Sequence, residues 1–97
     1  MARPRLTRAA RRDLLEIGRY TRERWGDDQC RRYLTQLDQR FRSLAKAPTS
    51  GRTCDEIKAG YWRYHEGRHV IFYKIAGKTL EIVRILHERM LPSRRLQ

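Results

Sequence analysis

The stretch GRHVIFYKIAGKTLEIVRILHERM, residues 67–90, decides the fold of this chain. Its β-branched and aromatic residues fall into two runs, 68–75 and 79–86, with Ala76-Gly77-Lys78 between them. This pattern predicts two strands joined by a tight turn. Apolar residues occupy both alternating positions of each run, so we expect both faces of this hairpin to be at least partly covered.

The composition is strongly basic. The chain has 97 residues, 39% of them hydrophobic and 35% charged, and a formal net charge of +12. This length predicts one domain over residues 1–97, and the charge predicts an acidic partner: nucleic acid, an acidic protein or an anionic membrane surface. No apolar run approaches the roughly 20 residues of a membrane span, and the N-terminus lacks a signal-peptide core, so we expect a cytoplasmic protein without a membrane partner.

Two amphipathic helices are expected before the hairpin, at about 8–25 and 28–46. Thr7 can cap the first, and Asp27 or Asp28 can cap the second after a stop at Gly26. One apolar stripe marks each helix: Ala10, Leu14, Ile17 and Tyr20 or Thr21 in the first, and Cys30, Tyr33, Leu34, Leu37, Phe41, Leu44 and Ala45 in the second. The short connection between them predicts an antiparallel helical hairpin.

The remaining segments complete an α+β fold. We expect an N-terminal edge strand at 3–6, a loop at 49–56 and a further strand at 58–64, which a turn at Glu66-Gly67 joins to the hairpin. Residues 87–97 form a basic tail with a short helical turn near Pro92. The helices should pack on one face of a largely antiparallel sheet. We expect Cys30 to be a small buried thiol and Cys54 an incidental loop residue, with no disulfide and no zinc site.

Candidate catalytic groups are scattered and match no hydrolase, phosphate-loop or metal motif. They are His65, His69, His87, Tyr61, Tyr64, Tyr73 and Arg84. His87 lies between Arg84 and Arg89, a combination that could hold a scissile phosphate and move a proton in a metal-free ribonuclease. The same three residues could equally form a basic contact patch.

Four segments together resemble the ParE branch of the RelE/ParE toxin superfamily. They are DLLEIGRYTRERWG (13–26), RRYLTQLDQRFRSLAKAPTSGR (31–52), GYWRYHEGRHVIFYKI (60–75) and EIVRILHERM (81–90). The resemblance covers nearly the whole chain. It implies the toxin half of a type II toxin–antitoxin pair, without a cofactor, neutralised by a ParD-like antitoxin whose acidic, amphipathic segment wraps the toxin. ParE-type toxins poison DNA gyrase, whereas RelE-type relatives cut messenger RNA on the ribosome.

The residues favour the gyrase reading. RelE-type nucleases carry cationic side chains along the third strand and a tyrosine in the tail, but here residues 70–73 are apolar and no tyrosine follows Tyr73. Leu91 also departs from the aspartate that ParE-like chains often carry there. We therefore expect a non-enzymatic protein that inhibits DNA gyrase by binding the A subunit of that enzyme. Any contact with DNA is expected to be indirect, through the antitoxin or through gyrase. The alternatives are a RelE-type endoribonuclease using His87, Arg84 and Arg89, or a degenerate toxin that only binds its antitoxin.

Two sets of contact residues follow from the resemblance and the charge pattern. The expected target-binding residues are Arg84, His87, Arg89, Met90, Arg94 and Arg95. The expected antitoxin-binding residues are Arg12, Arg19, Tyr20, Tyr33, Leu37, Arg40, Phe41, Ile71 and Tyr73.

Overall fold

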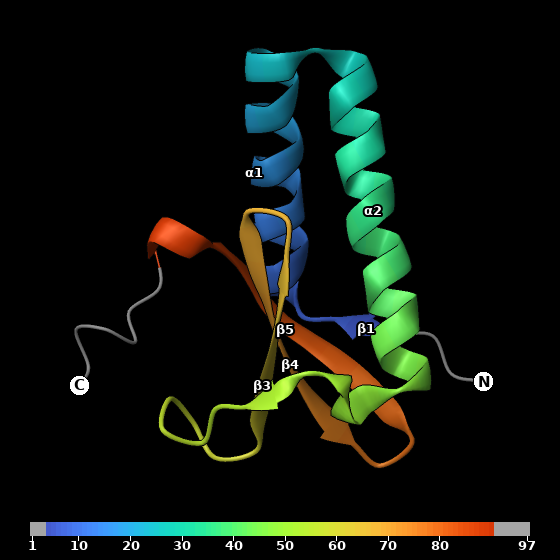
Figure 1. Cartoon of the computed structure of the whole chain (residues 1–97), viewed down its shortest axis with the longest axis vertical. Helices are drawn as coiled ribbons and strands as arrows, with labels where there is room; N and C mark the ends of the chain where they lie inside the picture. Colours follow the sequence, from blue (N-terminus) through green and yellow to red (C-terminus); the bar gives the residue numbers. More distant parts are fainter. Residues whose placement is uncertain (1–3, 91–97) are drawn as a thin grey trace.

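Two antiparallel helices pack on one face of a five-stranded sheet (Figure 1). The structure is a computed structural model, and it describes residues 4–90. The elements are β1 (Arg5–Leu6), α1 (Arg8–Trp25), α2 (Asp27–Lys46), a 3-10 turn η1 (Pro48–Ser50), β2 (Arg52–Thr53), β3 (Tyr61–Glu66), β4 (His69–Ala76), β5 (Thr79–His87) and a second 3-10 turn η2 (Glu88–Met90). The strand order is β1-β5-β4-β3-β2; β1 runs parallel to β5 and the other pairs are antiparallel. The expected α+β class and the placement of the helices on one face are confirmed.

The helical hairpin turns sharply at Gly26. This residue has φ of 92°, a conformation that favours glycine, and it ends α1 and precedes α2. The expectation that Asp27 or Asp28 caps α2 is wrong, because both lie in its first turn and no side chain caps it. Their carboxylates still stabilise the positive N-terminal end of the helix dipole. Thr7 caps α1 as expected, accepting a hydrogen bond from the Ala10 amide at 3.0 Å.

Each face of the sheet has its own apolar cluster, which confirms the two-sided covering of the hairpin. The larger cluster joins the helices to the sheet through Ala10, Ile17, Leu37, Phe41, Leu44, Ile71, Tyr73, Leu80, Ile82 and Ile85. On the other face Val70 and Phe72 pack with Cys54, and Ile57 lies against them. Cys54 is fully buried, so it is a core residue of this second cluster and the expectation of an incidental loop residue is wrong. Cys30 is a buried thiol as expected, donating to the Gly18 carbonyl at 3.2 Å.

A β-bulge in β5 keeps its apolar side chains on the helical face. Phe72 pairs with Arg84 and Tyr73 pairs with Ile82, so Val83 is the additional residue. The extra residue shifts the alternation, and both Ile82 and Ile85 therefore reach the larger cluster.

Several element bounds differ from those expected. β3 begins at Tyr61 rather than at residue 58, and the two-residue strand β2 forms within the segment expected to be a loop. The turn before β4 is Gly67-Arg68 rather than Glu66-Gly67, because Glu66 still pairs with His69. β5 includes His87, and η2 follows it directly. Leu91, the expected turn near Pro92, Arg94 and Arg95 lie outside the described residues.

Candidate partner-binding surfaces

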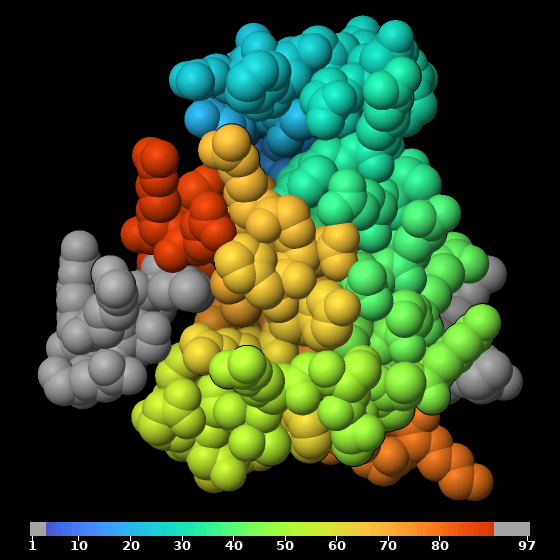
Figure 2. Space-filling model, in the orientation of Figure 1, coloured from blue at the N-terminus to red at the C-terminus, as the bar shows by residue number. Residues whose placement is uncertain are grey.

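The end of β5 presents part of the expected target-binding set. Figure 2 shows this red segment at the edge of the molecule, next to the yellow β3–β4 turn. Arg89 and Met90 are exposed, and Met90 has 63% of its surface accessible. The His87 Nδ1 atom accepts the Arg89 amide at 3.1 Å, and the Glu88 amide donates to the Arg68 carbonyl at 2.9 Å. These bonds fix η2 against the β3–β4 turn, so Arg89 and Met90 project from an ordered support.

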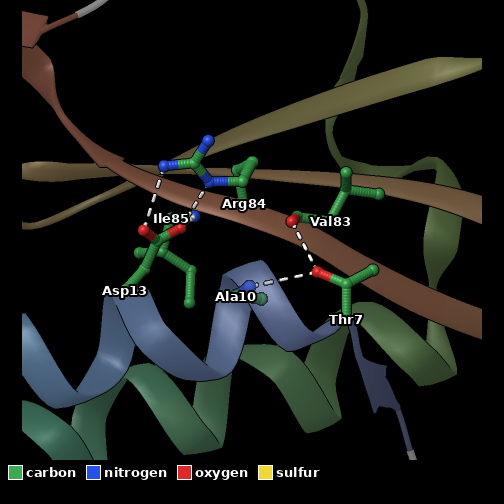
Figure 3. A network of polar contacts seen from close by, with 6 residues as sticks. All are labelled: Thr7, Ala10, Asp13, Val83, Arg84 and Ile85. Carbon is green, nitrogen blue, oxygen red and sulfur yellow. Dashed lines mark hydrogen bonds and ion pairs between the residues drawn. The ribbon is translucent and has the colours of Figure 1, made fainter.

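Arg84 belongs to a structural network rather than to that exposed end. Its Nε and Nη2 atoms donate to the two carboxylate oxygens of Asp13 at 2.8 and 3.1 Å (Figure 3). The hydrogen bond from Arg84 to Asp13 raises the pKa of the guanidinium. Two of its donors therefore bind Asp13 on α1, and only the remaining donors of this half-exposed side chain are left for the target contact or scissile phosphate expected of it.

The three histidines are brought to one end of the sheet, but they have different partners. The Nδ1 atom of His69 lies 2.6 Å from the Tyr33 hydroxyl, and its ring meets that of His87 edge-on at 5.3 Å between centroids. Burial, with a smaller effect from the charge of His87, lowers the pKa of His69 to about 4. His65 instead pairs with Glu88, its Nε2 atom 2.9 Å from the carboxylate. His69 is thus held as a neutral, packed ring.

Tyr33 and Arg40 attach α2 to the β3–β4 turn. The Tyr33 hydroxyl accepts the Arg68 amide at 3.2 Å, and burial raises its pKa. Arg40 Nε donates to Glu66 Oε1 at 2.7 Å, which raises the pKa of Arg40, and its guanidinium lies 4.5 Å from the centre of the Tyr64 ring. Both residues were expected to bind an antitoxin, but their polar groups hold the fold together.

Four other residues of the expected antitoxin-binding set are core residues. Leu37, Phe41, Ile71 and Tyr73 are each at most 2% exposed. This corrects the expectation for Leu37, Ile71 and Tyr73, whose side chains the fold itself covers, whereas Phe41 also lines the groove between the helices. Arg12, Arg19 and Tyr20 remain exposed on α1, where Arg19 pairs with Glu16 and the Arg24 guanidinium lies over the Tyr20 ring.

An apolar groove between the helices was not expected from the sequence. It is lined by Leu6, Arg11, Leu14, Leu15, Leu34, Asp38 and Phe41, and it has a volume of about 510 Å³. Leu15 is 75% exposed, the largest value among the exposed large apolar side chains of the described residues. The available signal was the Leu14-Leu15 pair, since Leu15 falls outside the stripe that packs on the sheet and has no role in the core.

Across residues 4–90, no group of three or more histidine, cysteine, aspartate or glutamate side chains is arranged to hold a metal ion. In the same part of the chain, no helix is both long enough and apolar enough to cross a membrane.

Comparison with known proteins gives consistent results. A family model described as the ParE toxin of type II toxin–antitoxin system, parDE, matches residues 5–92. Toxin ParE1 of Mycobacterium tuberculosis is 42% identical over 92 residues, covering 94% of each chain. Toxin ParE1 of Caulobacter vibrioides is 38% identical over 86 residues, covering 89% of this chain and 88% of that protein. A solved structure of the chromosomal ParDE system from P. aeruginosa shares the fold with a TM-score of 0.72 at 18% identity, over 88% of this chain and 96% of that one.

Proposed function

The chain belongs to the ParE toxin family of type II toxin–antitoxin systems, and from this premise we propose that it inhibits DNA gyrase by binding and is neutralised by a ParD-like antitoxin. In this proposal it acts in the cytoplasm, makes no chemical change in its target and contacts the A subunit of gyrase. The observation that supports an antitoxin as the partner is the exposed apolar groove between α1 and α2.

The groove suits an amphipathic, acidic segment. Its apolar walls are four leucines and Phe41, and its two charged lining residues are Arg11, next to the exposed Arg12, and Asp38, which pairs with Arg42. An apolar stripe on the partner would cover Leu14, Leu15 and Leu34, while its carboxylates would face the arginines. The net charge of +12 would speed the encounter, and apolar burial would hold the complex. A segment that folds as it binds can cover such an extended surface.

Ionic strength separates these two contributions. Raising salt is expected to slow association with the antitoxin more than it weakens the final complex, because screening acts mainly on the encounter of exposed charges. Stopped-flow association rates and equilibrium titrations, each at low and high salt, measure the two effects. An association rate that does not respond to salt would contradict an electrostatically steered encounter.

The end of β5 is our proposed gyrase-binding surface, with Arg89 and Met90 at its centre. Arg94 and Arg95 extend this set along the chain. Binding without catalysis is supported by the contacts of Arg84 and His87, the two residues that a nuclease would need, because both already have hydrogen-bond partners within the fold. Asp13 binds Arg84, and the His87 Nδ1 atom accepts a backbone amide.

A supercoiling assay with purified gyrase tests the target directly. Inhibition is expected as the toxin approaches stoichiometry with the enzyme, and its absence at stoichiometric excess would reject gyrase as the target. Expression without an antitoxin gives the cellular counterpart. Filamentation with a DNA-damage response supports gyrase, immediate translation arrest supports an mRNA nuclease, and harmless growth supports a toxin that has lost its activity.

A further inference from the structure

Two arginines lie directly opposite each other on neighbouring strands. Arg52 of β2 is the register partner of Arg63 of β3, so their side chains leave the sheet on the same face. Arg63 is in turn opposite Phe72, which packs in the cluster on the face away from the helices. Like charges directly opposite across an antiparallel pair are destabilising. The arrangement therefore favours an anion that compensates the two charges.

The described part of the chain does not supply that anion. Within residues 4–90, no carboxylate lies within ion-pairing distance of Arg52 or Arg63. Asp55 is close in the chain, but it accepts the Gly60 amide at 2.9 Å instead. Arg63 is also partly buried, so its charge is less hydrated than that of a fully exposed arginine.

The pair opens into a cavity of about 460 Å³. Its other lining residues are Ser50, Gly51, Tyr64, His65 and Val70. His65 follows Arg63 by two positions on β3 and reaches the same face, although its Nε2 atom is shared with Glu88 at 2.9 Å. The lining contains no carboxylate side chain. The two guanidinium groups thus define an open, positively charged recess.

We propose that this recess binds the phosphate backbone of a nucleic acid strand. Two guanidinium groups can bind phosphate oxygens bidentately, and arginine is suited to this geometry. Tyr61, Arg63 and His65 alternate along one face of β3 at intervals of roughly 6.6 Å, which provides a row rather than a single point. Lys58 adds a further cation 5.9 Å from the centre of the Tyr61 ring. The Tyr61 ring itself packs against the Cys54, Val70 and Phe72 cluster, so the cations and not this ring would make the contact. A positively charged groove that follows the backbone is typical of surfaces that bind single strands without reading their sequence.

This assignment is independent of gyrase as the target. It differs from the expectation that the protein meets DNA only indirectly, and the binding experiment below decides between the two. It also separates two functions in space, because the apolar groove for an antitoxin lies between the helices and the basic recess lies on the other face of the sheet. An acidic peptide is the other class of ligand that such a recess could attract, and it differs in offering carboxylates in place of phosphates.

Fluorescence anisotropy of the full chain with a labelled 12-nucleotide single-stranded DNA tests the proposal. The variant Arg52→Gln/Arg63→Gln removes the recess charge, and Arg31→Gln/Arg32→Gln on α2 removes the same charge from an exposed helical surface. The recess variant is expected to bind at least about tenfold more weakly at low salt. Its log–log salt slope should fall by about 1.4, the value for two phosphate contacts to a single strand. The α2 variant should change affinity by less than about threefold.

Three results would overturn the proposal. Equal losses in both variants would show that net charge alone attracts DNA, and an unchanged affinity in the recess variant would place DNA elsewhere. A labelled oligoglutamate peptide that loses tenfold in the recess variant, while DNA binding is retained, would assign the recess to an acidic protein. The thermal midpoint of the recess variant should be unchanged or higher, because a like-charge pair is removed. Gyrase inhibition is measured separately, so the two proposals can fail independently.

Discussion

The Asp13 carboxylate binds Arg84 through two hydrogen bonds of 2.8 and 3.1 Å across a sequence separation of 71 residues. The same carboxylate accepts the Ile85 amide at 2.9 Å. At the N-cap of the same helix, the Thr7 hydroxyl donates to the Val83 carbonyl at 2.7 Å (Figure 3). The beginning of α1 thus satisfies the backbone of β5 at the bulge residue Val83 and at Ile85 just after it, where β1 is too short to continue the ladder.

Removing this carboxylate should destabilise the fold. Asp13→Ala is expected to lower the free energy of unfolding by about 2 kcal/mol, because it removes charge-assisted hydrogen bonds and leaves the Ile85 amide without its acceptor. Urea denaturation measures the loss. The matched control is Asp38→Ala, which removes an exposed helical pair with Arg42 and should cost no more than about 0.5 kcal/mol. Equal losses in the two variants would contradict the anchoring role of Asp13.

Acidification should destabilise the protein through His69. Its pKa is about 4 in the folded state, against 6.5 for an unperturbed histidine, so the unfolded chain binds more protons between these values. Stability therefore falls as pH decreases from 6.5 to 4, by about 2 kcal/mol from this residue. His69→Gln should show a smaller loss than the wild type over that interval in urea melts. His65→Gln is the control for an exposed histidine, and a wild-type profile in His69→Gln would exclude this origin.

Antitoxin affinity should depend on Leu15. Leu15→Glu places a carboxylate in the apolar groove, where an acidic partner would meet repulsion in place of apolar burial, and we expect binding to weaken at least about tenfold. Isothermal titration with the cognate antitoxin measures this. Ile75→Glu, at an exposed apolar position near the β4–β5 turn, is the control and should bind normally. If both variants bind like the wild type, the groove is not the docking surface.

Gyrase inhibition should depend on the end of β5. The variant Arg89→Gln/Met90→Ser is expected to raise the toxin concentration for half-inhibition of supercoiling about tenfold, because it removes one exposed cation and one exposed apolar contact. Arg32→Gln serves as the control for net charge. Antitoxin binding should be retained in both.

The alternative enzyme is tested by His87→Ala. Loss of ribosome-dependent RNA cleavage in this variant, with antitoxin binding intact, would replace the gyrase proposal with the nuclease one.

The helices and the central hairpin could be predicted because their patterns are local. The apolar period of Leu37, Phe41 and Leu44 specifies a helix, and the β-branched runs of β4 and β5 specify strands. β2 could not be found in this way, since two residues carry no pattern and Arg52–Thr53 becomes a strand only by pairing with β3. The bulge at Val83 could not be predicted either. Apolar residues occupy both alternating positions of β4 and β5, so the sequence pattern does not define how the two strands pair.

The site was predicted less well because sequence does not show which partner covers an apolar or charged group. Phe41 and Ile71 were assigned to a binding surface, although the fold itself buries them. Arg84 was assigned to a target, although its partner Asp13 lies on a distant part of the chain. Leu15 and the Arg52–Arg63 pair become significant only when neighbouring elements are placed beside them.

The contacts between the start of α1 and β5 can form only when synthesis of the chain is nearly complete. Thr7 and Asp13 emerge from the ribosome early, but their partners Val83 and Ile85 are made 76 and 72 residues later. Until then α1 and α2 can pair locally while their apolar faces lack the strands that cover them. Such long-range pairing slows folding and leaves an incomplete chain exposed to other proteins. An antitoxin already present in the cell would therefore meet this toxin's helices before the toxin has finished folding.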